Sequence, residues 1–174
     1  MTLGRRFLRL ATALSAVCLA ASCATTERIE AAGDVHALLI AIRDDDHGAF
    51  DAYVDRHALE AELSGRIMDA TARPGQPDSV RGLGLALAGP LAHLAGEALL
   101  RPKVFLAVAE YYGYRPETPI PSQLEIAGAL RALPDGRVCA AAKRRGPCML
   151  TFADEAGVWR LVSFDGDLNL LAAK

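Results

Sequence analysis

The sequence predicts an α+β domain in which N-terminal helices pack on a C-terminal four-stranded antiparallel meander. The first half of the chain spaces its apolar residues as helices do, and the segment after Tyr114 breaks into short apolar runs joined by turns of hairpin length. Helices first and strands last is typical of an α+β fold with helices on one face of the sheet. The 174 residues are 52% apolar and 23% charged, which indicates one domain with a sizeable core and excludes disorder for the bulk of the chain.

Three helices are expected between Thr26 and about Thr71. The first has four apolar residues on one face, at helical spacing: Val35, Leu38, Leu39 and Ile42. The residues 44–46, all aspartates, interrupt this pattern, and a short second helix follows around Phe50. Asp55 stands where a residue would cap the N-terminus of the third helix. The inward face of that helix is expected to be Leu59, Leu63, Ile67 and Met68.

A break dense in proline and glycine, residues 73–78, separates these helices from a strongly apolar one. In the eighteen residues from Leu83 to Leu100, only His93 and Glu97 are strongly polar. This length would admit a transmembrane helix, but Pro90, Glu97 and the glycines favour a core helix that is kinked near Pro90. We therefore expect this run to be buried within the fold.

A further helix is expected to start at Pro102, because proline suits the first turn of a helix, and to end at Tyr111. Three prolines then form an extended connector: Pro116, Pro119 and Pro121. Four strands are predicted after it, at about 123–133, 137–143, 147–153 and 158–165, and the short turns between them favour an antiparallel meander. The first of these segments is rich in alanine and leucine, which leaves a helix open there.

Residues 1–22 are typical of a signal peptide of the lipoprotein type. Three arginines precede the twelve-residue apolar segment Leu10–Ala21, which is too short to span a bilayer. The small residues before Cys23 resemble a bacterial lipobox, at which a peptidase cuts before a cysteine that carries a lipid. We therefore expect lipid attachment at Cys23, with ordinary cleavage after Ala24 as the alternative.

Export would place the mature chain on the periplasmic side of the cell envelope. Because Ala24 rather than an aspartate follows Cys23, the lipid anchor is expected in the outer membrane, by analogy with enteric bacteria. Residues 23–29 would form a tether and residues 30–171 a single α+β domain. Removal of the signal peptide takes away three arginines and no acidic residue, so the net charge changes from −2 to −5. This charge gives no support to nucleic-acid binding, which needs a basic excess.

Two cysteines remain in the folded part when Cys18 is removed with the signal peptide and Cys23 carries the lipid. In an oxidising compartment, Cys139 and Cys148 are expected to form a disulfide across a hairpin whose turn contains Gly146. Two free, buried thiols are the alternative. No second Cys or His pair accompanies them at zinc spacing, so the cysteines do not predict a metal site.

Several phrases of the sequence occur in an order that resembles a known family. The stretch Ala41–Asp55 joins a helix, an acidic break and a third helix; Leu87–Leu91 is followed by Leu99–Phe105; and Gly157–Leu161 closes the series. These phrases resemble bacterial exported domains of unknown function catalogued as number 2939, from about Glu30 to Leu168. The resemblance implies no known reaction. The order of helices and meander is also similar to the cone-shaped nuclear transport factor 2-like superfold, which hosts enzymes and binding modules alike.

Five side chains are candidates for lining a pocket. His93 and Glu97 lie one helical turn apart on a shared face, with a hydrogen-bonded surface pair as the alternative. Three large amphipathic rings would line a cavity in a cone-shaped fold, with core or rim positions as the alternative: Tyr111, Tyr112 and Trp159. No third ligand accompanies His93 and Glu97, so we expect neither a metal nor another cofactor, and we assign no catalytic residue.

These observations favour a membrane-tethered, non-enzymatic envelope domain that binds a partner protein or a small apolar ligand. A second hypothesis is an enzyme or small-ligand binder that uses a cavity between the helices and the sheet. In an enzyme, His93, Glu97 and a tyrosine would be the acid–base groups. A third is a structural lipoprotein whose domain packs on another envelope component.

Overall fold

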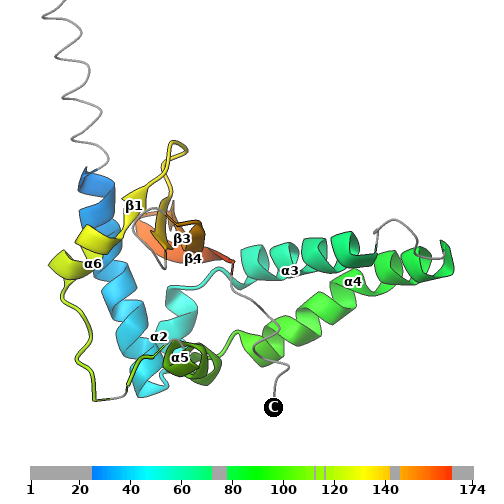
Figure 1. Cartoon of the computed structure of the whole chain (residues 1–174), viewed down its shortest axis with the longest axis horizontal. Helices are drawn as coiled ribbons and strands as arrows, with labels where there is room; N and C mark the ends of the chain where they lie inside the picture. The colour runs from blue at the N-terminus through cyan, green and yellow to red at the C-terminus, as the bar shows by residue number, and fades with distance from the viewer. Residues whose placement is uncertain (1–24, 72–77, 112, 116, 142–145, 166–174) are drawn as a thin grey trace, which may run out of the picture.

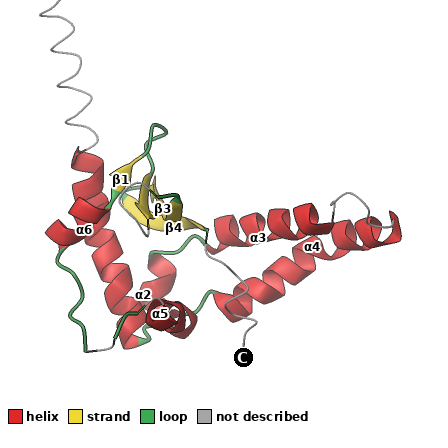
Figure 2. Cartoon of the chain, in the orientation of Figure 1, coloured by secondary structure: helices red, strands yellow, loops and turns green. Residues whose placement is uncertain are grey.

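The structure is a computed structural model, and it describes residues 25–71, 78–111, 113–115, 117–141 and 146–165. Helices precede strands along the chain, which confirms the α+β class (Figure 1). The helices are the N-terminal helix (residues 25–44), α2 (His47–Ala52), α3 (Arg56–Thr71), α4 (Asp78–Leu99), α5 (Pro102–Tyr111) and α6 (Gln123–Ala129). The strands are β1 (Arg131–Ala132), β2 (Val138–Ala141), β3 (Cys148–Glu155) and β4 (Val158–Phe164), coloured yellow in Figure 2.

The N-terminal helix buries the apolar face that the sequence predicts. Val35, Leu38 and Ile42 are buried, and the helix already includes residues 25–29 of the expected tether. The acidic break that follows has a capping role, because the Asp46 side chain accepts a hydrogen bond from the Ala49 N–H (3.0 Å) at the start of α2. A short turn at residues 45–46 therefore separates the N-terminal helix from α2.

Asp55 caps α3 as predicted, since its Oδ1 accepts a hydrogen bond from the Ala58 N–H at 3.0 Å. The chain just before this cap pairs with the last strand in a parallel bridge between Val54 and Leu161. The Leu161 N–H donates to the Tyr53 carbonyl (2.9 Å), and the Asp55 N–H donates to the Leu161 carbonyl (3.0 Å). Residues 53–55 thus extend the sheet beside β4, and the sequence pattern did not predict this pairing.

The four strands form an antiparallel meander in the order β1-β2-β3-β4, which confirms the predicted topology. The prediction of a strand over 123–133 is wrong for most of its length, because α6 occupies Gln123–Ala129 and β1 is only two residues long. Ser122 and Glu125 form a capping box: the Ser122 hydroxyl accepts from the Glu125 N–H (3.4 Å), and the Glu125 carboxylate accepts from the Ser122 N–H (2.7 Å). This reciprocal pair fixes the start of a helix.

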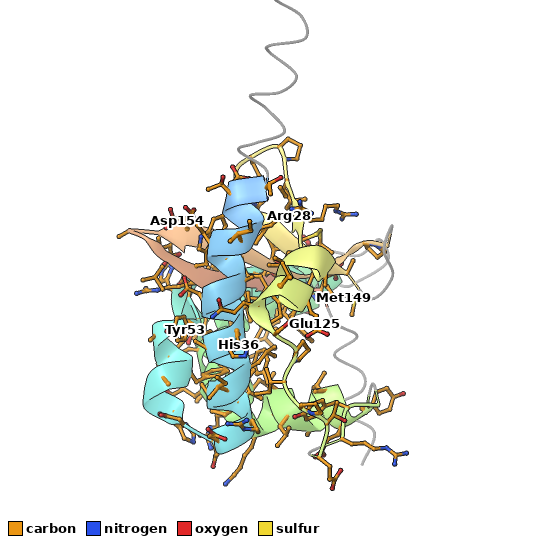
Figure 3. The ribbon with its side chains drawn as sticks, turned by 90° about the vertical axis from the view of Figure 1, so that its left-hand side faces the viewer. Arg28, His36, Tyr53, Glu125, Met149 and Asp154 are labelled. Carbon is orange, nitrogen blue, oxygen red and sulfur yellow. A yellow bond between two sulfur atoms is a disulfide. The ribbon has the colours of Figure 1, made fainter. Side chains whose placement is uncertain are left out.

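The core lies between the sheet and the helices that cover it. The N-terminal helix and α6 lie side by side in front of the strands in Figure 3. Phe50, Phe152 and Leu161 are fully buried there, and Trp159 belongs to the same cluster. The Trp159 N–H donates to the Asp34 carboxylate at 2.8 Å, which ties β4 to the N-terminal helix.

Helices α3 and α4 pack against each other as a hairpin that projects from this body as an arm (Figure 1). Helix α4 continues from Asp78 to Leu99 with Pro90 inside it. Its small residues Ala88 and Ala92 are buried, whereas several of its leucines are exposed, so the expectation of a fully buried helix is wrong. Across the described parts of the chain, no helix is both long enough and apolar enough to cross a membrane.

Candidate functional site

The predicted disulfide between Cys139 and Cys148 is confirmed. It joins β2 to β3 with a Cα–Cα distance of 5.6 Å. The two residues are not direct partners in the ladder, because Cys139 lies opposite Thr151 and the register shifts between Ala140 and Ala141. Arg131 lies over the bond, with its Nη2 3.1 Å from the Cys148 sulfur and 3.4 Å from the Cys139 sulfur. The bond therefore links the two strands of the β2–β3 hairpin, next to the position where β1 pairs with β2.

His93 and Glu97 line a polar groove between α2, α3 and the C-terminal half of α4. The groove has a volume of about 540 Å³ and is open to solvent. Its lining residues are His47, Asp51, Arg56, Glu60, His93, Glu97 and Arg101. The spacing of four residues between His93 and Glu97 correctly predicted that they share one face of a helix. The contribution of α3 was missed, because it depends on how two helices align in space.

The hydrogen-bond partner of His93 is Glu60 rather than Glu97. The His93 Nδ1 lies 3.2 Å from Glu60 Oε2. Gly96 makes this approach possible: a Cβ at that position would lie only 2.7 Å from the Cγ of Glu60. The glutamate side chain of α3 therefore rests directly on the backbone of α4. A donor proton on Nδ1 would leave Nε2 of His93 as an acceptor toward the groove.

The arginines of the groove are held by other protein groups. The Nη2 of Arg56 donates to Asp51 Oδ1 (2.6 Å) and to the Leu100 carbonyl (2.8 Å), and Arg101 Nε donates to the Glu97 carbonyl (2.8 Å). Among the residues that the structure describes, no group of three His, Cys, Asp or Glu side chains could hold a metal ion. The groove can therefore offer hydrogen bonds and paired charges to a small polar molecule.

The aromatic residues proposed with His93 and Glu97 lie elsewhere. Tyr111, at the end of α5, is 67% exposed, whereas Trp159 is only 5% exposed and packs in the core. Neither residue lines the polar groove. Tyr112 and Cys23 lie outside the described residues. Trp159 therefore packs in the core, which was the alternative to a cavity position for this ring.

A small apolar pocket lies between α3, α4, α5 and β4. It is lined by Leu59, Glu62, Leu63, Arg66, Leu99, Leu100, Val104, Phe105, Val108 and Phe164. Its volume is about 80 Å³, whereas pockets for drug-sized ligands have roughly 300–1,000 Å³. The guanidinium of Arg66 donates to Glu62 (2.5 Å) and to the Phe164 carbonyl (2.9 Å). The pocket is too small for a metabolite-sized ligand.

A carboxyl pair lies at the junction of α3 and the sheet. Burial raises the pKa of Glu155, and a hydrogen bond with the Asp55 carboxyl group adds to the rise. Arg160 partly opposes it, with its Nη1 3.3 Å from Glu155 Oε2. Burial and the neighbouring carboxyl group therefore outweigh the arginine, and the pKa of Glu155 lies above its ordinary value.

A row of exposed leucines lies on α4. Four leucines, which we call the leucine stripe, are exposed by 62%, 41%, 47% and 66% respectively: Leu83, Leu87, Leu91 and Leu94. They lie on one face of the helix, since they follow one another at steps of three and four. The buried residues Ala88 and Ala92 lie on a different face. The leucine stripe is therefore directed away from α3.

A family model described as a protein of unknown function, DUF2939, matches residues 13–108, which is more than half of the chain. The chain belongs to the DUF2939 family. The matched range covers the arm and the polar groove and ends within α5, so the phrase Gly157–Leu161 lies beyond the match. Neither the curated proteins nor the solved structures contain a match to this DUF2939 chain, and a nuclear transport factor 2-like fold stays a prediction.

Proposed function

We propose that this DUF2939 protein is a membrane-tethered lipoprotein of the cell envelope, and that its domain is a non-enzymatic interaction module. The leucine stripe is the observation that carries the second part. Contiguous apolar patches of a few hundred Å² on a soluble domain are usually interaction surfaces. The stripe lies on a projecting arm, where another molecule can reach it (Figure 1).

The tether is supported by the sequence before the described domain. An arginine-containing start, a short apolar segment and Cys23 after small residues resemble the signal of a lipoprotein, which supports this proposal. We propose that the lipid on Cys23 holds the domain at the periplasmic side of the outer membrane. The non-enzymatic assignment is supported by the small volume of the apolar pocket and by the mutual pairing of charges in the polar groove.

Metabolic labelling with an alkyne fatty acid tests the tether. The full chain, expressed in a Gram-negative host, should be labelled and should sediment with the outer membrane. Cys23→Ser should abolish both, whereas the matched control Cys18→Ser changes a cysteine that is removed with the signal peptide and should change neither. An unlabelled wild-type chain whose mature N-terminus is Thr25 would establish ordinary cleavage after Ala24 and refute the lipoprotein.

Site-specific photo-crosslinking in the same cells tests the interaction module. A photo-reactive amino acid at Leu87 should give a product with a protein. The matched control is Leu124, which is 81% exposed but lies on α6, and it should give none. A product from a second copy or from another envelope protein would support the module. Crosslinking of Leu87 to lipid alone, or to nothing, would refute it.

The polar groove favours a second candidate function, a site for a small polar ligand or for acid–base chemistry. Its basis is the contact between His93 and Glu60, which Gly96 makes possible. Binding can be measured by the change in the His93 ring signals in NMR spectra on addition of small zwitterionic metabolites, with His93→Gln as the control for assignment. If no compound shifts these signals at millimolar concentration, this candidate should be abandoned.

A further inference from the structure

We infer that Cys148 is a site of thiol–disulfide exchange, and that Arg131 activates its bond to Cys139 toward reduction. The substrate class is a low-molecular-weight dithiol, which reduces the bond and is itself oxidised to a disulfide. The inference goes beyond the proposed function, since it needs neither the lipid anchor nor the leucine stripe.

The pairing of β1 with β2 places Arg131 at the disulfide. Arg131 lies directly opposite Cys139 in the register, so their side chains lie on the same face of the sheet. From there the guanidinium reaches both sulfur atoms, with Nη2 3.1 Å from Cys148 Sγ and 3.4 Å from Cys139 Sγ. Its Nη1 donates to the Gly146 carbonyl at 3.3 Å. The arginine is therefore held over the bond by the strand register and by the Gly146 carbonyl.

The positive charge of Arg131 faces the sulfur atoms. Within the residues that the structure describes, its guanidinium contacts these sulfurs and a carbonyl and forms no ion pair with a carboxylate. Five other arginines do form such pairs: Arg43, Arg56, Arg66, Arg137 and Arg160. A neighbouring arginine lowers the pKa of a cysteine thiol. Arg131 therefore favours the thiolate form of whichever cysteine is released from the bond.

The two cysteines differ in their exposure to solvent. Cys139 is fully buried, whereas Cys148 is partly exposed. The contact of Arg131 with Cys148 is also exposed, whereas its contact with Cys139 is partly buried. Thiol–disulfide exchange needs access of a thiolate to one of the two sulfur atoms. Cys148 is therefore the sulfur that a small thiolate attacks, and Cys139 is the leaving group.

The exchange has two steps. In the first, a thiolate of the dithiol bonds to Cys148 Sγ, the bond to Cys139 breaks, and its electron pair stays on Cys139 Sγ as a thiolate. In the second, the other thiolate of the dithiol attacks its partner sulfur in the mixed disulfide and releases the Cys148 thiolate. The dithiol is oxidised to a cyclic disulfide, and the two protons that it loses are taken up by the two cysteine thiolates. Arg131 lies close to both thiolates in turn.

The rate of reduction by dithiothreitol at pH 7 tests the role of Arg131, in the full chain expressed in and purified from a Gram-negative host. Arg131→Gln should slow the reduction at least threefold, because a thiol of higher pKa leaves more slowly, and Arg131→Lys should restore most of the rate. Arg137→Gln is the matched control, since Arg137 pairs with Asp135 instead, and it should leave the rate unchanged. A variant that merely loosened the sheet would be reduced faster. An unchanged or faster rate in Arg131→Gln would therefore overturn the role of Arg131.

The ionisation of Cys148 provides a second measurement. In Cys139→Ala, Cys148 is the one free thiol whether Cys23 is lipidated or removed with the signal peptide. Its alkylation by iodoacetamide should reach half of the maximal rate at a pH about one unit lower than in Cys139→Ala/Arg131→Gln. The same midpoint in both chains would overturn the activation by Arg131.

Trapping identifies the sulfur that is attacked. The wild-type chain is treated with glutathione, a monothiol that stops at the mixed disulfide, and N-ethylmaleimide then blocks the released cysteine. Mass spectrometry of peptides should find glutathione on Cys148 and maleimide on Cys139. Glutathione on Cys139, or no adduct on either cysteine, would overturn Cys148 as the site of exchange.

Discussion

The Cys139–Cys148 disulfide should account for a large share of the stability of this small sheet. The bond closes a loop with a sequence separation of nine residues. Loop-closure entropy for a loop of this size gives a stabilisation of about 2.6 kcal/mol at 25 °C, because the bond restricts the unfolded chain more than the folded one. In a domain of this size, such a loss lowers the melting temperature by roughly 5–10 °C.

The assay is urea denaturation of a chain that starts at Thr25, followed by circular dichroism at pH 7. The double variant Cys139→Ala/Cys148→Ala should lose about 2–3 kcal/mol of unfolding free energy and should not respond to dithiothreitol. Reduction of the wild type should have nearly the same effect as the double variant. A loss below about 0.5 kcal/mol in both would refute the reasoning, since it would mean that the hairpin is equally restricted in the unfolded chain.

Three further outcomes follow from single contacts. Ser122→Ala should destabilise the fold by about 1 kcal/mol in urea denaturation, because it removes the capping box of α6; an unchanged midpoint would contradict this role. Since burial raises the pKa of Glu155 in the folded state, its contribution to stability is fully present below the unfolded pKa and is lost as the pH rises through the folded pKa. Glu155→Gln should therefore flatten the fall in melting temperature between about pH 4.5 and neutral pH, and an unchanged slope would contradict the shift. Gly65→Ala, where a Cβ has nothing within 4 Å, should stabilise α3 by roughly 0.5–1 kcal/mol. Gly96→Ala should stabilise less or destabilise, since its Cβ would meet Glu60 at 2.7 Å; equal gains in urea denaturation would refute the close approach.

Much of the fold was predictable because its signals are local. The helical spacing of Val35, Leu38 and Ile42, the N-cap at Asp55 and the turn-separated strands all act within a few residues. The wrong strand over 123–133 also had a local signal that was overlooked. Ser122 followed three residues later by Glu125 is a capping box, and it outweighs the apolar run that suggested a strand.

The candidate site was less predictable, since its contacts join distant parts of the chain. Glu60 meets His93 because α3 and α4 align in one particular register, and no pattern in either helix specifies it. Val54 pairs with Leu161 although three residues are too few for a periodic signal. Trp159 looked like a pocket residue because a large ring suits either a cavity or a core, and only the packed fold decides between them.

The pairing of residues 53–55 with β4 bears on when this protein can finish folding. Residues 53–55 pair with Leu161, Asp34 accepts from the Trp159 N–H, and Arg66 donates to the Phe164 carbonyl. These bonds cross about a hundred residues, and all end on β4, the last strand of the described part of the chain. A chain cut after residue 108 would keep the family's helices and lose the strand that completes them. The helices therefore cannot complete their packing until β4 has been made, and contacts of such high sequence separation slow folding.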